Sequence, residues 1–420
     1  MSQPVNSALS AIPAAERRFG FLDHLTLWGS LGVGLLVIQL GTFLVPALSF
    51  AEALSAIALG SLVGVALLAW VGRLGAQSGL ASAGLIHGAL GSKLAALPVS
   101  ANVLQLMGWA VFEIVVLRDG IGAIAKQQWG VTAPLATTVF VGAILFALLS
   151  LSMVGVVRKL VRHIGLPLMV LALGWLTWQF LGEASRTGWD VLFARAGTGV
   201  MGFGAAVDLA IAMPISWLPL VADYSRYGKS SRGAAGGIAV GYLLANTWCL
   251  SLGVLIAMLH PGGEMMATIL LASGGAIALA LVLCDEIDNA YGDLYSGSVS
   301  THSLAPWLPL RRLGPVLAVL ATALACFVPI HDYEGFLLMI GSVFVPLFGV
   351  VIAHHGLHAK QPDGRAVAWP ALIAWLAGIA VYQLVSRAAG DIGASLPSLA
   401  TAFCLQLALS GVAARRLQPA

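Results

Sequence analysis

The sequence predicts an all-α integral membrane protein with twelve transmembrane helices. Of its 420 residues, 59% are apolar and 9% are charged, whereas an ordinary soluble domain carries about 25% charged residues. Twelve apolar stretches reach the roughly 18 residues that span a bilayer, and lysines and arginines gather in alternate connecting segments. The mean hydropathy of +0.93 disfavours a soluble enzyme and excludes a disordered or nucleic-acid-binding chain.

The apolar stretches divide the chain into two halves and a final pair. The first six cover residues 22–48, 52–72, 97–117, 132–152, 164–182 and 200–222. The last six cover residues 235–259, 267–292, 313–330, 335–354, 367–386 and 393–413. If two five-helix halves precede two extra helices, the chain divides into a tail (1–20), two repeats (21–182 and 183–355) and a final segment (356–420).

The basic residues predict the orientation. Segments expected on the cytoplasmic side hold sixteen of the 21 lysines and arginines, and such an excess marks the cytoplasmic face. The stretch 1–20 lacks the basic and apolar regions of a signal peptide. We therefore expect a protein of the cell (inner) membrane, surrounded by the lipid bilayer, with both termini in the cytoplasm.

The first and sixth stretches contain helix breakers at matching places in the two halves. Gly41 and Pro46 interrupt the first stretch, and Pro214 and Pro219 interrupt the sixth. Proline removes a helical hydrogen bond, and in lipid the freed backbone groups require protein or a water-lined cavity. Paired interruptions of this kind indicate the central site of a transporter. The alternative is an ordinary proline kink in each helix.

The third stretch contains an aromatic ring and an acid on one face. Trp109 and Glu113 are four residues apart and therefore lie one helical turn from each other. A carboxylate at that depth costs about 3 kcal/mol, so Glu113 needs a partner or a function. Trp109 offers a flat stacking surface, and Glu113 accepts hydrogen bonds from ring N–H or amino groups. The alternative is a structural bond from Glu113 to another helix, and we expect Asn102 and Gln105 to form bonds of that kind.

The eighth stretch contains four of the 18 acidic residues within nine positions. We expect Asp285, Asp288 and Asn289 on one side of the helix. Glu286 and Asp293 are expected on another side, so that the acids do not all face one ligand. The pattern predicts an ion or proton site with substrate contacts. The alternative for Asp293 is that the helix emerges into water there, and the role of Glu286 is open.

The remaining polar groups have simpler interpretations. Asp208 is either a structural partner or a coupling group, and residues 223–227 are expected to form a loop or gate. His354, His355 and His358 lie at a cytoplasmic helix end without a carboxylate. A solvated helix end is therefore favoured there over a metal site.

Four motifs together resemble the nucleobase:cation symporter-1 family, whose members include permeases for cytosine, purines, allantoin and hydantoins and hydroxymethylpyrimidine transporters. The motifs are residues 59–64, 102–113, 223–227 and 288–296. Residues 102–109 are most similar to the branch for hydroxymethylpyrimidine and cytosine. The resemblance implies a five-plus-five inverted repeat of the LeuT type with broken helices 1 and 6. Substrate would lie between helices one, three, six and eight.

The resemblance also implies the residues of the substrate site. The matching positions are Gln39, Trp109, Glu113, Ser216, Trp217 and Asn289. Hydantoin-type members have a glutamine where this chain has Glu113. Because a carboxylate only accepts hydrogen bonds, the difference favours a donor-rich ligand such as an aminopyrimidine.

A coupling cation, sodium or a proton, is the one ion that the resemblance implies, and no other cofactor is expected. Sodium-coupled relatives use helix-one carbonyls, which match Leu35 and Ile38, and two hydroxyls on helix eight, which are replaced here by Leu283 and Cys284. A thiol is a poor ligand for a hard cation. Asp285 either carries a proton or restores an oxygen ligand, and Asp288 joins it in the expected coupling set.

The sequence thus predicts a secondary active transporter, and no enzyme, that imports hydroxymethylpyrimidine or cytosine by cation-coupled alternating access. The substrate could instead be a different heterocycle of the family, a purine, allantoin or a hydantoin. The competing classes of protein are an uncoupled facilitator and an integral-membrane metal-dependent enzyme. No obligate protein partner and no nucleic acid are expected.

Overall fold

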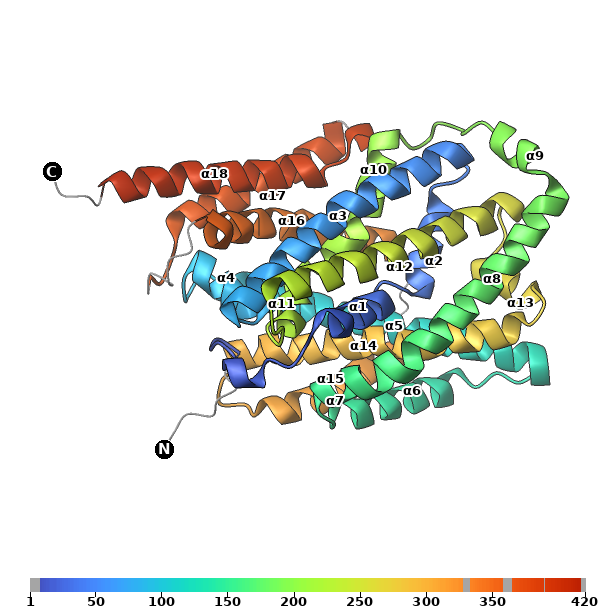
Figure 1. The fold of residues 1–420 in the computed structure, drawn as a ribbon, viewed down its shortest axis with the longest axis horizontal. Coiled ribbons are helices and arrows are strands. Elements are labelled where there is room, and N and C mark those ends of the chain that lie inside the picture. The colour runs from blue at the N-terminus through green and yellow to red at the C-terminus, as the bar shows by residue number, and fades with distance from the viewer. Residues whose placement is uncertain (1–7, 328–332, 358–364, 389, 417–420) are drawn as a thin grey trace.

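A computed structural model describes residues 8–327, 333–357, 365–388 and 390–416, and the predicted cluster member His358 lies outside them. The described chain forms one bundle of long helices (Figure 1). An isolated bridge joins Phe19 to Gly228. The described chain begins and ends at the same end of the bundle (Figure 1).

Most helices follow the predicted stretches within a few residues, but α5 runs twelve residues beyond the predicted 97–117, and α14 begins eight and ends twelve residues later than the predicted 267–292. The first part contains η1 (Ala14–Glu16), α1 (Phe21–Leu31), α2 (Leu35–Phe43), α3 (Phe50–Ser78), α4 (Ser82–Leu90), α5 (Ala96–Trp129), α6 (Pro134–Leu149), α7 (Met153–Gly155), η2 (Val156–Gly165), α8 (Leu166–Thr187) and α9 (Trp189–Ala194). The second part contains α10 (Phe203–Ser216), α11 (Leu218–Ser225), α12 (Ser231–Leu259), α13 (Met265–Leu271), α14 (Gly275–Leu304), α15 (Leu310–Phe327), α16 (Tyr333–Leu357), α17 (Trp369–Ala388), η3 (Gly390–Ile392) and α18 (Ser395–Arg416).

The multi-span prediction is confirmed, whereas the number of twelve spans stays a prediction. Within the described residues, eight helices are long and apolar enough to cross a membrane, and the bent pair of α1 and α2 would be a ninth. The other three predicted stretches coincide with α6, α14 and α18. The apolar parts of α6 and α18 are shorter than 18 residues, and α14 contains the four clustered acids.

The first helix is broken, but the predicted position of the break was wrong. Residues 32–34 separate α1 from α2, and the two parts meet at a bend of 58°. Gly41 lies inside α2, where a side chain would collide with the backbone of Leu250 on α12. Pro46 follows the end of α2. Gly41 therefore permits close packing of two helices. The bend lies instead at Gly32 and Gly34.

The second interruption lies where the sequence predicts it. Trp217 separates α10 from α11, and in the described chain only the α1–α2 pair bends by more than 40°. Trp28 of α1 packs edge-on against Trp217, with the ring centroids 5.9 Å apart. The two interruptions therefore meet inside the bundle.

Small residues bring α10 close to α3. A Cβ atom on Gly60 would lie 2.5 Å from the Val207 carbonyl oxygen, and one on Gly64 would overlap Pro214. Glycines spaced four apart let helix backbones approach closely in a membrane. This packing explains the glycines of the 59–64 motif and fixes α10 beside the break.

Asp208 is a structural partner. Its two carboxylate oxygens accept hydrogen bonds from the backbone N–H groups of Ala394 and Ser395, each at 3.0 Å. These groups lie at the start of α18, where a helix leaves N–H groups without partners. Of the two roles left open for Asp208, the hydrogen bonds support the structural one.

The remaining polar motifs are also architectural. The Ser82 N–H at the start of α4 donates to Asp223 at 2.9 Å, as expected for a residue that shapes a loop. Asn102 donates to the Pro219 carbonyl oxygen at 3.2 Å. His355 lies 2.8 Å from the Leu85 carbonyl oxygen. No three metal-ligating side chains converge anywhere in the described ranges.

Candidate functional site

A cavity lies where the two helix interruptions meet. It is lined by residues of α1, α2, α5, α10, α11 and α14 and by Gly34 and Trp217 at the interruptions. Its empty space is about 410 Å³, counting the part open to solvent. The polar groups in its wall are Glu113, Ser216, Glu286, Asn289 and Asp293. These elements correspond to the first, third, sixth and eighth predicted spans.

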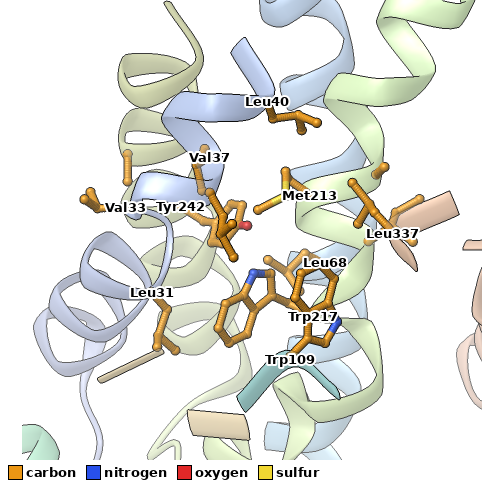
Figure 2. Packing of buried hydrophobic residues seen from close by; sticks show 14 of the residues in the cluster. Leu31, Val33, Val37, Leu40, Leu68, Trp109, Met213, Trp217, Tyr242 and Leu337 are labelled. Carbon is orange, nitrogen blue, oxygen red and sulfur yellow. The ribbon is translucent and has the colours of Figure 1, made fainter. Parts of the chain in front are cut away.

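Two tryptophans form the aromatic part of the wall. Trp109 and Trp217 lie close together in Figure 2 and are 7% and 8% exposed. Phe336 packs edge-on against Trp109 at 5.1 Å and lies directly against Gly108. Gly108 therefore admits a neighbouring helix rather than a ligand. Trp28 packs edge-on against Trp217 and limits its movement. The rings of Trp109 and Trp217 therefore offer flat faces to a planar ligand.

Two carboxyl groups meet in another part of the wall. Glu113 and Glu286 are 6% and 1% exposed, and their carboxyl groups are within hydrogen-bonding reach of each other. The Leu35 N–H, in the first turn of α2, donates to Glu286 at 3.0 Å. The N-terminus of a helix stabilises negative charge. Within the described chain no N–H or O–H group donates to Glu113 Oε2 or Glu286 Oε1.

Asn289 adds an acceptor to this wall. Its amide group donates to the Val33 carbonyl oxygen at 2.9 Å and so occupies a carbonyl freed by the break. Its Oδ1 atom has no donor in the part of the chain that the structure describes. A Cβ atom on Gly34 would lie 3.1 Å from a Glu286 oxygen and 3.2 Å from Asn289 Nδ2. Glycine at this position therefore lets α14 reach the backbone of the break.

The face of α14 that lines the cavity differs from the prediction. Glu286, Asn289 and Asp293 line it, because positions three and four apart share a helix face. The expected separation of Glu286 and Asp293 from Asn289 is therefore wrong. Asp293 is 4% exposed, so the alternative of a solvated acid is wrong as well. The spacing of these three residues was the signal that could have identified them.

Five of the six predicted substrate residues line the cavity, and Gln39 does not. The break lies at residues 32–34, so the cavity borders the first turn of α2 at Leu36 and Val37. Gln39 lies further along that helix and is half-buried. Gln39 was expected in the site because the break was predicted near Gly41. With the break at residues 32–34, Gln39 lies away from the cavity.

The predicted coupling residues separate into three groups. Ser30 of α1 donates to Asp285 at 2.6 Å, and Asp288 lies beside the same hydroxyl group. Cys284 is exposed and points away from this contact, because it lies one residue, about 100°, around the helix from Asp285. The remaining two are buried: the Leu35 N–H donates to Glu286, and the Ile38 carbonyl faces Gly253 on α12.

A helical membrane bundle with a cavity at two helix interruptions is typical of a secondary transporter. A family profile described as permease for cytosine/purines, uracil, thiamine, allantoin matches residues 11–359. The chain therefore belongs to this family, the nucleobase:cation symporter-1 permeases. It is a cation-coupled nucleobase-type transporter and not an enzyme.

Named relatives extend over nearly the whole chain. The cytosine permease of Escherichia coli strain K12 is 21% identical over 385 residues, which cover 91% of this chain and 88% of the relative. The transporter Mhp1, solved in a closed conformation with bromovinylhydantoin bound, superposes with a TM-score of 0.83 at 16% identity, over 98% of this chain and 96% of Mhp1. A Na⁺-coupled sialic acid symporter reaches 0.67 at 11% identity, over 97% and 92% of the two chains. These structures establish an Mhp1/LeuT-like fold.

Proposed function

We propose that the protein imports a small planar aminopyrimidine, hydroxymethylpyrimidine or cytosine, by cation-coupled alternating access. The observation that carries the proposal is the polarity of the cavity wall. Glu113 Oε2 and Asn289 Oδ1 are buried acceptors that receive no hydrogen bond within the described chain. An unsatisfied buried acceptor costs about 1–3 kcal/mol, and a ligand that donates to both removes that cost.

An aminopyrimidine fits these groups better than a ring with carbonyl groups on the same edge. The ring would stack on Trp109, with its exocyclic amino group donating to Glu113 and a second donor meeting Asn289. The carbonyl oxygens of a uracil edge would face the acceptor atoms of Glu113 and Asn289 and would leave these atoms without a donor. The name of the Escherichia coli relative, cytosine permease, supports the same substrate class. Purines, allantoin and hydantoins are the competing substrates.

We place the coupling cation, sodium or a proton, where α1 meets α14. Asp285 and Asp288 lie beside the Ser30 hydroxyl group, and carboxylate and hydroxyl oxygens suit a hard cation. Cys284 is exposed and lies outside this contact. The helix α1 ends at the break that borders the cavity. Binding of the cation between Ser30 and the two acids would therefore change the position of α1 and hence access to the substrate cavity.

We also propose twelve spans in the cell (inner) membrane with both termini in the cytoplasm. The described chain begins and ends at the same end of the bundle (Figure 1), which requires an even number of crossings. The excess of basic residues in the expected cytoplasmic segments supports the direction. Cysteine labelling at both ends of the intact chain, from each side of a sealed vesicle, tests this orientation.

Thermal unfolding of the purified protein tests the substrate class. A ligand that binds only the folded state stabilises it by about 2.7 kcal/mol at one hundred times its Kd. The panel contains cytosine, hydroxymethylpyrimidine, uracil, adenine, allantoin and a hydantoin, each with and without sodium and at two pH values. We expect stabilisation by the two aminopyrimidines alone. Stabilisation by uracil or allantoin in their place would contradict the proposal.

A further inference from the structure

The cavity wall combines three carboxyl groups with no basic side chain. Glu113, Glu286 and Asp293 are 6%, 1% and 4% exposed, and no lysine, arginine or histidine of the described chain lines the cavity. Buried carboxylates that lie close together repel each other and lose hydration, so a positive charge placed among them is stabilised. On the basis of the proposed function, we infer that the aminopyrimidine binds as its ring-protonated cation and supplies that charge.

The geometry favours a positive ring over a neutral one. The Leu35 N–H, at the start of α2, donates to Glu286 and stabilises negative charge on it. Asn289 Oδ1, on a side chain that is 3% exposed, is a further acceptor without a donor in the described segments. A protonated aminopyrimidine has a donor on the ring nitrogen where the neutral ring has an acceptor. The faces of Trp109 and Trp217 add cation–π attraction for the same charge.

The groups that surround the cavity do not provide the missing charge. Four groups lie near the carboxyl groups of the cavity without lining it: Asp285 and Asp288 on α14, the Cys249 thiol on α12 and the Tyr224 hydroxyl group on α11. All four are acidic or neutral. The Ser30 hydroxyl group of α1 is also neutral and already bonded to Asp285. A cationic ligand would therefore supply a charge that these side chains do not.

Binding as a cation has two consequences for transport. The proton enters on the ring nitrogen and leaves when the ring deprotonates after release, so only an N–H bond forms and breaks. A 4-aminopyrimidine without a 2-oxo group is a stronger base than cytosine, and the site should therefore prefer a hydroxymethylpyrimidine-type ring. One positive charge would cross the membrane with each ring, in addition to any coupling cation.

Calorimetric titration of the full-length protein in detergent, at fixed sodium and several pH values, tests the inference with cytosine and 4-aminopyrimidine. While the carboxyl groups of the cavity stay ionised, affinity should be constant below the pKa of the free ligand. Above it, affinity should fall about tenfold per pH unit, because only the protonated fraction binds. The pH at which the decline begins should differ between the two ligands and follow the pKa of each. A decline at one pH for both ligands, or no decline, would overturn the inference and leave the proposed function intact.

Two further measurements complete the test. The permanently charged 4-amino-1-methylpyrimidinium should bind with no pH dependence at pH values above the pKa of 4-aminopyrimidine. Asp293→Asn should weaken binding of protonated 4-aminopyrimidine about tenfold, whereas Glu52→Gln, at the exposed start of α3, should not. Equal affinities in the two variants would contradict the inference. Failure of every aminopyrimidine to bind at any pH would instead refute the proposed function.

Discussion

The substitution Glu113→Gln should separate stability from ligand binding, because its two effects have opposite signs. The change keeps the shape of the side chain and replaces one carboxyl oxygen by an NH₂ group. The Glu286 carboxyl group lies at this contact, and its Oε1 atom has no donor in the described chain. The new amide would donate to it, and hydrogen bonds to charged groups contribute about 1.5–3 kcal/mol. We expect the free energy of unfolding to stay constant or rise by up to that amount.

Ligand binding should weaken in the same variant. The cavity loses one of its negative charges and gains a donor where an amino group is expected to bind. Loss of one charge-assisted hydrogen bond of about 1.5–3 kcal/mol raises the Kd for an aminopyrimidine by about 10- to 150-fold. Thermal unfolding and calorimetric titration in one detergent measure both effects, with Glu52→Gln as the control. A variant that unfolds more easily, or one that binds as tightly as the parent protein, would refute the reasoning.

Three other substitutions test the aromatic wall and the packing around it. Trp109→Ala should raise the Kd of the ligand about 5- to 150-fold through lost stacking, whereas Trp129→Ala, at a ring that is 74% exposed, should leave the Kd unchanged in the same titration. Asp208→Ala leaves two N–H groups at the start of α18 without an acceptor and should lower the free energy of unfolding by about 1–3 kcal/mol, and Asp208→Asn by less. Gly60→Ala forces α3 away from α10 and should cost about 1–3 kcal/mol, whereas Gly174→Ala, with open space around it, should not destabilise the protein. Equal thermal shifts in the two glycine variants would contradict this account.

The sequence predicts the helical bundle well because lipid imposes a simple rule. Apolar length and the distribution of basic residues depend on the bilayer and not on the neighbouring helices. The position of the first break is harder to predict from the sequence, because a glycine in a membrane helix can mark either a break or a close contact between helices. Gly41 packs against another helix, whereas Gly34 lies at the break. Both glycines stand in the same apolar stretch, so the sequence around them does not separate the two roles.

The candidate site is predictable only in part for a related reason. The energetic penalty for a buried acid singles out Glu113, and helical spacing joins it to Trp109 on the same face of α5. On α14 the acids at positions 285 and 286 lie about 100° apart around the helix. Asp285 turns toward Ser30 and Glu286 turns toward the cavity. Which of them faces a ligand depends on how the helix is rotated against α1, and the sequence does not specify that rotation.

The carboxylate of Asp208 has a consequence for how the molecule is made. The family profile ends at residue 359, but the two donors to this carboxylate lie at residues 394 and 395, where α17 and α18 pack together (Figure 1). A nascent chain folds from its N-terminus, so α10 enters the bilayer before its partners leave the ribosome. Until then it holds a buried carboxylate without its native donors. A helix synthesised long after α10 therefore completes this part of the core, and termination of translation before α18 would leave it unfinished.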